Sequence, residues 1–344
     1  IDSTSPNVTT LPNTHAPLRT PHRLLAALVL VTFPLIWVGG LVTTYTAGMA
    51  VPDWPTTYGY NPFLYPWHKW VSGPFDLFVE HGHRLLAMLA GLLAILLVVA
   101  AWVKDAPRWL RWLAVAALAG VIAQGVLGGL RVVFDARQLA KIHGCVGPLF
   151  FAYCVALWEL TSRRWHRAVA VRQAGTVATR VLMATTLGLA YLQLVLGAHV
   201  RHLPLSVDHR DFALAVGLHI IGAGALLLMP LVLALRARRH HADARALRRP
   251  ISLLALLVTV QVALGCLTWL VNYGWPVWFD RWPWAAQFTI QVDSLLQSLT
   301  TTAHVATGSL ILAVATVGTL RSFRDLQTIP ATAAQPSFTL ETAR

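Results

Sequence analysis

Eight apolar runs restrict this chain to a fold that crosses a membrane many times. Each run has about 20 residues, the length of helix that spans a hydrocarbon core of roughly 30 Å. Only 12% of the 344 residues are charged, whereas a soluble domain carries about 25%. We therefore expect an all-α membrane protein with eight transmembrane helices, at 24–45, 81–103, 110–130, 141–161, 178–200, 213–235, 251–273 and 297–320.

Lysine and arginine are divided unequally between the two sides of this predicted bundle. The termini and the loops on their side hold 18 of them, whereas the opposite loops hold 7. Because basic residues favour the cytoplasmic side, we expect cytoplasmic termini and outward-facing loops at 46–79, 131–140, 201–212 and 274–296. This distribution accounts for the net charge of +13 without a nucleic-acid partner.

A short motif recurs along the chain. Gln is followed four residues later by Gly at 124–128, 193–197 and 261–265, and at 35–39 Leu replaces Gln. Small residues let helices or a flat ligand approach closely. Each motif precedes an outer loop and a helix with His near its start. We therefore expect two pseudo-symmetric four-helix bundles, with domains at 1–22 (a disordered tail), 23–165, 166–177 (a basic inner linker), 178–322 and 323–344 (a second tail).

Four histidines lie in the first third of four alternate spans: His83, His143, His219 and His304. All four spans run from outside inward, so the histidines should lie at one depth near the outer surface. Two histidines on neighbouring helices can bind a haem iron from both faces, and each half supplies one pair. A single intramembrane histidine could equally hydrogen-bond a neighbouring helix, but four in register favour iron ligands.

Other metal centres fit the sequence less well. Zinc usually takes three or four nitrogen or sulfur ligands, and each half offers two histidines at this level. The three cysteines lie in apolar runs without a ligand spacing. A di-iron carboxylate bundle needs several glutamates, whereas this chain contains only Glu80, Glu159 and Glu341.

Glu80 distinguishes the first half from the second. It lies three residues before His83, on the same face of a helix, whereas Val216 occupies the matching place before His219. We interpret Glu80 as a catalytic proton donor or acceptor, and the first half as the reacting site. The alternative is that Glu80 merely stabilises the start of its helix.

Three arginines are candidates for holding the charge of a ligand. Arg84 follows His83 directly, and Arg131 and Arg201 stand at matching places after spans three and five. Arg131 and Arg201 could pair with haem propionates through charge-assisted hydrogen bonds, or be ordinary interfacial arginines, and Arg84 is a candidate for binding the substrate haem. His81 should point away from His83 as a structural or lipid-facing residue.

The chain resembles the haem A synthase family over about residues 25–320. The resemblance rests on four features: Glu80-x-x-His83-Arg84; Gly39-Gly40 followed by Pro52-Asp53-Trp54-Pro55; Lys141-Ile142-His143-Gly144; and the later His219 and His304. Many bacterial members carry a cysteine pair in the outer loop of the first half. Loop 46–79 has none, which puts this chain in the class without that pair.

The resemblance implies an oxidoreductase that converts the C8 methyl group of haem O to a formyl group, giving haem A for cytochrome c oxidase assembly. It implies an iron-containing haem b cofactor at His219 and His304. It places the substrate haem at His83 and His143, with Glu80 required for activity. Haem O synthase and oxidase assembly factors are the expected partners, and a homo-oligomer is compatible with the family. The electron donor stays open.

Two other functions agree with parts of the pattern. A di-haem b-type cytochrome would only transfer electrons, and an acid in one half alone disfavours it. A transporter with inverted repeats has its site at the membrane midplane, whereas these repeats are parallel and their histidines lie near the outer face. We expect a bacterial plasma membrane rather than a mitochondrial inner membrane, because no transit peptide is evident.

Overall fold

The computed structural model describes residues 18–45, 47–168, 170–172, 175–204, 206–240, 245–279 and 281–327. In this part of the chain eight helices are long and apolar enough to cross a membrane, which confirms the expected all-helical membrane protein. They are α1 (Arg19–Thr44), α3 (Phe75–Val103), α4 (Arg108–Val133), α5 (Arg137–Leu160), α7 (Thr176–Arg201), α8 (His209–His240), α9 (Arg245–Tyr273) and α11 (Leu295–Asp325). Most of the two predicted tails, 1–17 and 328–344, lies outside the described residues.

Most helices are longer than hydropathy alone predicts, because they continue into the polar residues at their ends. α3 begins at Phe75, directly after Pro74, so Glu80 lies in its second turn. A side chain that stabilises a helix start lies in the first turn, so this alternative role for Glu80 is not supported. α11 begins after Ser294, whose side chain accepts a hydrogen bond from the backbone N–H of Gln297.

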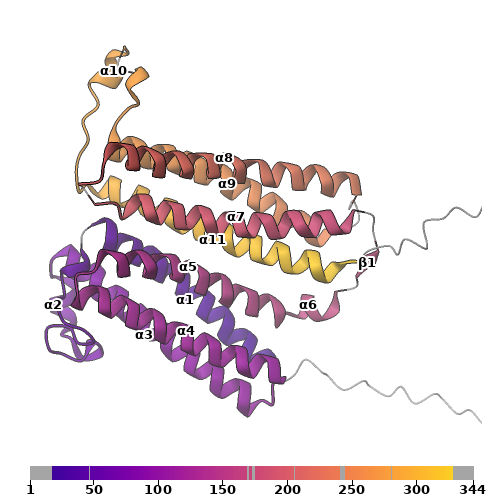
Figure 1. The fold of residues 1–344 in the computed structure, drawn as a ribbon. Helices are drawn as coiled ribbons and strands as arrows, with labels where there is room; N and C mark the ends of the chain where they lie inside the picture. The colour runs from indigo at the N-terminus through magenta and orange to yellow at the C-terminus, as the bar shows by residue number, and fades with distance from the viewer. Residues whose placement is uncertain are drawn as a thin grey trace, which may run out of the picture.

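The helices pack as two groups of four. In the first group α1 and α4 each pack against α3 and α5, and in the second α7 and α9 each pack against α8 and α11. Figure 1 shows the first group in indigo to magenta and the second in rose to yellow. The start of α1 and the end of α11 lie at one end of the molecule, here called the terminal end. The long loops after α1 and α9 lie at the other, the loop end.

Small residues bring the two groups together. α11 packs against α1 and α5, and α5 also packs against α7. Where α1 meets α11, a Cβ on Gly40 would lie 2.7 Å from the Thr302 methyl carbon. The hydroxyl groups of Thr44 and Thr302 lie 3.2 Å apart beside this contact. Close approach through glycine and threonine is a common way for membrane helices to associate.

Ion pairs join the two groups at the terminal end. Glu159 of α5 accepts hydrogen bonds from Arg321 of α11 at 2.8 and 2.9 Å. It also accepts a hydrogen bond of 3.1 Å from Arg164. Arg164 lies in the short helix α6 (Arg163–Arg167) and pairs with Asp325 as well. Glu159 therefore fixes the end of α5 to the end of α11.

The linker between the groups is also attached to the end of α11. Strand β1 (Val171–Arg172) pairs in parallel with strand β2 (Leu326–Gln327). Arg180 of α7 donates to the carbonyl of Leu326. The sequence analysis did not predict this small sheet, because two-residue strands leave no periodic pattern.

The loop end carries two folded segments. The segment between α1 and α3 contains η2 (Ala47–Met49), η3 (Pro62–Leu64) and α2 (Trp67–Val71). The segment between α9 and α11 contains η4 (Val277–Phe279) and α10 (Pro283–Ala286). In Figure 1 this second segment projects away from the helices.

Candidate functional site

A cavity of about 1680 Å³ is lined by residues of both helix groups. A typical pocket for one small ligand has roughly 300–1,000 Å³, so this cavity has room for two large ligands. The structure brings every site residue predicted from the sequence to its wall: Glu80, His83, Arg84, Arg131, His143, Arg201, His219 and His304.

The four histidines face one another in the two predicted pairs. The ring centroids lie 6.4 Å apart for His83 and His143, and 6.2 Å apart for His219 and His304. With metal–nitrogen bonds of about 2.1 Å and a centroid about 1.1 Å behind each nitrogen, two imidazoles on one metal have centroids about 6.4 Å apart. Both pairs therefore fit a single iron atom held from two sides, as in a haem.

A glycine on the preceding long helix positions each of these rings. A Cβ built on that glycine would lie 2.8–3.2 Å from the ring carbon Cε1, closer than the 3.5–4.0 Å of an ordinary carbon contact. Any side chain there would displace the ring. The four contacts are Gly39–His83, Gly128–His143, Gly197–His219 and Gly265–His304.

Glu80 is the acidic group beside the first pair. Only 2% of its surface is exposed. Its carboxylate accepts hydrogen bonds from two nitrogens of Arg84, both at 3.2 Å, and lies 3.5 Å from Arg131 Nη2 on α4. Because Glu80 and His83 are one helical turn apart, their side chains share the same part of the cavity. At the matching place beside the second pair the wall is formed by Val216.

Arg84 connects this acid to the loop that covers it. Besides its contacts with Glu80, its guanidinium donates to three loop carbonyl groups at 2.6–2.7 Å: those of Val51, Asp53 and Thr56. Arg84 was predicted to bind substrate haem. In the structure it lines the cavity and also holds the loop, a second role that its position in the sequence did not indicate.

Asp53 organises the same loop. Its carboxylate accepts hydrogen bonds from the Thr56 hydroxyl at 2.5 Å and from the backbone N–H groups of Tyr58 and Gly59 at 2.8 and 2.9 Å. Partial burial raises the pKa of Asp53, but these hydrogen bonds outweigh it and hold the pKa below its ordinary value. The next residue, Trp54, packs its indole against Gly129 of α4 and lines the cavity. The loop therefore forms part of the cavity wall.

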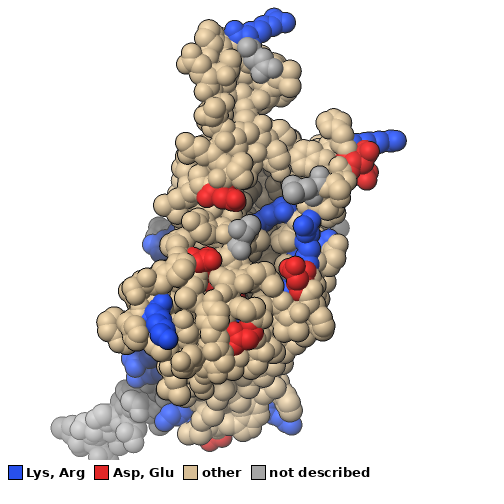
Figure 2. Space-filling model, turned by 90° about the vertical axis from the view of Figure 1, so that its left-hand side faces the viewer, with Lys and Arg blue, Asp and Glu red and all other residues tan. Residues whose placement is uncertain are grey.

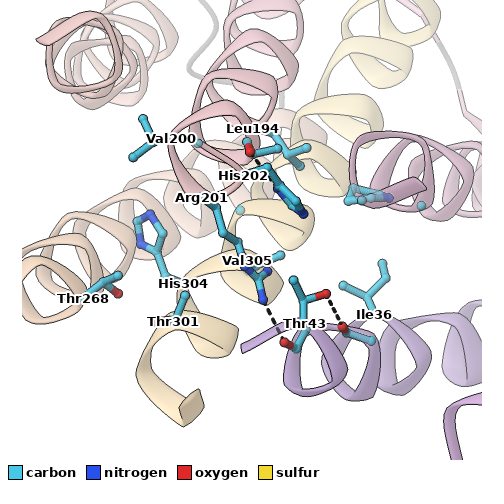
Figure 3. Close-up of a pocket in the computed structure, with 18 of the residues that line it drawn as sticks. Ile36, Thr43, Leu194, Val200, Arg201, His202, Thr268, Thr301, His304 and Val305 are labelled. Carbon is cyan, nitrogen blue, oxygen red and sulfur yellow. Dashed lines mark hydrogen bonds between the residues drawn. The ribbon is translucent and has the colours of Figure 1, made fainter. Parts of the chain in front are cut away.

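Arg201 reaches from the second helix group to the first. Figure 3 shows its side chain extending from α7 to α1, where the guanidinium donates to the Gly40 carbonyl at 2.9 Å, with His304 nearby on α11. Arg201 takes part in none of the ion pairs formed by the described residues. A partly buried cation without an acidic partner is unfavourable, so an anionic group on a ligand would suit this position.

The structure separates His81 from the other histidines. It is 1% exposed and its Nδ1 lies 3.1 Å from the Thr57 hydroxyl, with its ring packed beside those of Tyr65 and Trp70. His81 is therefore a structural residue under the loop, and the lipid-facing alternative is wrong.

Among the described residues there is also no cluster of three or more His, Cys, Asp or Glu that could hold a metal ion, so a zinc-type centre finds no site there.

Figure 2 looks onto the loop end of the molecule. Most of this face is neither acidic nor basic, and basic side chains are visible beside a hollow near its middle. Arg131 and Arg201 are the cavity-lining arginines at the ends of α4 and α7, on this side of the helices. The wall of the cavity thus combines a large apolar area with a few cationic groups, which matches an apolar ligand that carries carboxylates.

Comparison with known proteins places the chain in a family. The COX15-CtaA family, described as cytochrome oxidase assembly protein, matches residues 22–218. The chain belongs to this family. The match includes the first histidine pair and Glu80 and stops directly before His219, so the assignment of the second pair depends on the geometry described above.

Curated relatives cover more of the chain than the family match does. Heme A synthase from Shouchella clausii is 28% identical over 249 residues, which is 66% of this chain and 79% of the relative. Heme A synthase from Symbiobacterium thermophilum is 29% identical over 263 residues, 71% of this chain and 83% of the relative. Heme A synthase from Halalkalibacterium halodurans is 27% identical over 251 residues, with coverages of 66% and 79%. With its eight apolar helices, this chain is a multi-pass membrane protein of a family with bacterial members.

Proposed function

We propose that this protein is a haem A synthase, an oxidoreductase that converts the C8 methyl group of haem O to a formyl group in successive steps. Its family membership and the name of its relatives support this activity. The observation that carries the proposal is the pair of facing histidines beside Glu80, with a second facing pair that has no acid. A protein with two haem sites, one of them equipped for proton transfer, suits the oxidation of one haem with the help of another.

The second pair would hold the resident cofactor. His219 and His304, with ring centroids 6.2 Å apart, would be the axial ligands of haem b, and its iron would supply the electron-transfer chemistry. Arg201 would hold a propionate, because it lies on the same cavity wall without a carboxylate of the protein beside it.

The first pair would bind the substrate haem. His83 and His143 would position it at the iron, and Arg131 and Arg84 would attract its propionates. Glu80 would hold or transfer a proton at its carboxylate, which faces the cavity between the two arginines. The folded loop above Arg84 would exclude water from the reacting group.

We further propose that the two helix groups are pseudo-symmetric bundles, 23–165 and 178–322, with the basic linker 166–177 and both termini on the cytoplasmic side. The repeated glycine–histidine contacts support the symmetry, and the excess of Lys and Arg at the terminal end supports the orientation. The cavity would then lie toward the outer surface.

Haem O synthase would deliver the substrate, oxidase assembly factors would receive the product, and a homo-oligomer is part of the same proposal.

Pigment analysis tests the function. The protein is expressed together with a haem O synthase in cells without their own haem A synthase, and the extracted haems are identified by chromatography and mass. Haem A, or haem O with a hydroxylated C8 methyl group, is the expected result. Haem b alone in folded protein, with unchanged haem O in the membranes, would instead identify a di-haem cytochrome that only transfers electrons.

A further inference from the structure

The four histidine positions differ in one neighbour. Each ring lies against a glycine and near the backbone carbonyl four residues before that glycine. The side chain at this earlier position varies. It is glutamine beside three of the histidines, Gln124, Gln193 and Gln261, and leucine beside His83, where Leu35 takes its place.

The three glutamines contact the histidine residues. Gln193 Nε2 donates to the backbone carbonyl of His219 at 2.6 Å and lies 3.0 Å from its Nδ1. The equivalent amide of Gln124 lies 3.4 Å from the carbonyl oxygen of His143. These amides thus connect the helix that carries each histidine to the helix before it.

The third glutamine contacts the ring itself. Gln261 Nε2 lies 3.3 Å from His304 Nε2. Leu35 has no polar atom in its side chain, so it offers His83 none of these contacts. The buried Nδ1 atom of His83 has no hydrogen-bond partner in the structure, and the same is true of His143 and His304, so His83 differs in the missing amide and not in this atom.

A second residue difference accompanies the replacement of glutamine by leucine. Each glutamine amide occupies space that a glycine on the histidine's helix leaves open. The amide nitrogens of Gln124 and Gln261 would lie 3.6 and 3.4 Å from a Cβ on that glycine, and Gln193 Oε1 lies closer still. These glycines follow their histidines by three or four residues: Gly147, Gly222 and Gly308. His83 has no glycine at either distance: Leu86 follows it by three residues and Ala87 by four, whereas His219 has Gly222 at three and Ala223 at four.

We propose that His83 is the exchangeable axial ligand among the four, because Leu35 and Ala87 replace the glutamine–glycine pair that holds the other three. This rests on the proposed haem sites. Groups that orient a metal-bound histidine strengthen its binding, and their loss typically costs 10–100-fold in metal affinity. Leu35 is then a positioning residue that keeps one face of the first haem open to another ligand. That face carries Glu80, one turn before His83 on α3.

Carbon monoxide binding to the reduced, haem-loaded protein tests this inference. The wild type should bind carbon monoxide at one haem of the two, seen as a difference spectrum of half the total haem. In the double variant Leu35→Gln with Ala87→Gly, the carbon monoxide affinity should fall about tenfold or more, with total haem unchanged. Equal carbon monoxide binding by both haems of the wild type would overturn the proposal, as would unchanged affinity in the folded double variant.

The reciprocal change provides a second measurement. Gln193→Leu with Gly222→Ala removes the glutamine and its glycine from His219, so the second haem should now bind carbon monoxide as well. If that variant retains both haems and still binds one carbon monoxide, the glutamine does not hold its ligand and the proposal is wrong. Haem A formation is assayed separately. If the wild type makes haem A but the variants leave carbon monoxide binding unchanged, only this inference is refuted. If carbon monoxide binds selectively at the first haem but no haem A is formed, only the enzymatic function is refuted.

Discussion

Gly265 of α9 and His304 of α11 lie so close that a Cβ on the glycine would be 3.1 Å from the ring carbon Cε1. The same contact recurs at the other three histidines, so substitution of the glycine tests how the rings are held.

Substitution of Gly265 by Ala should displace the His304 ring and reduce the haem b content of the purified protein several-fold. An added methyl group in such a contact costs about 1–3 kcal/mol. Haem per protein, from the absorbance of the pyridine complex, measures the effect. Gly188→Ala on α7 is the matched control, because nothing lies within 4 Å of a Cβ there. Full haem content in Gly265→Ala would contradict the close packing.

Replacement of Glu80 by Gln should abolish most haem A formation while leaving the second haem in place. The amide keeps the size of the carboxylate but cannot transfer its proton, and loss of a general acid or base costs about 10²–10⁴ in rate. Haem A and hydroxylated haem O in the membranes are quantified by mass. Asp76→Asn, one turn earlier on α3 and outside the cavity wall, should retain activity. A Glu80→Gln protein with normal output would remove the catalytic role.

Replacement of Arg201 by Gln should lower the reduction potential of the haem at the second pair. A positive charge near a propionate favours the reduced haem, and a loss of about 1 kcal/mol corresponds to roughly 40 mV for one electron. Redox titration followed at the haem absorbance gives the value. The exposed Arg137, which is not part of the cavity wall, is the control as Arg137→Gln. Equal potentials in the two variants would show that Arg201 is not close to the haem.

The ion pairs at the terminal end should contribute to stability rather than to catalysis. Glu159→Gln removes the charge that receives two hydrogen bonds from Arg321 and one from Arg164, at an expected cost of about 1.5–3 kcal/mol. Thermal unfolding in detergent should begin at a lower temperature, with activity per folded protein maintained. Asp105→Asn breaks an exposed pair with Arg111 and should change stability little. The same stability in both variants would show that the Glu159 pairs do not hold the helix groups together.

The sequence by itself determined the eight spans, the four histidines and the acid next to one of them. Hydropathy over 20 residues and the spacing of polar residues within a helix are local properties, so they can be read from the chain. The predicted site residues all line one cavity in the structure, as histidines at matching depths in alternate spans allow, and their roles remain predictions.

Only the tertiary structure decided how these residues meet. Four kinds of contact join residues that are distant in sequence or lie on different elements. They are the facing rings of the two histidine pairs, the hydrogen bond from Arg201 to Gly40, the hydrogen bonds from Arg84 to the loop, and the ion pair of Glu159 with Arg321. The side chain of Arg84 could face a ligand or a backbone carbonyl with the same sequence around it. Such contacts depend on the relative position of packed helices and loops, which local periodicity does not specify.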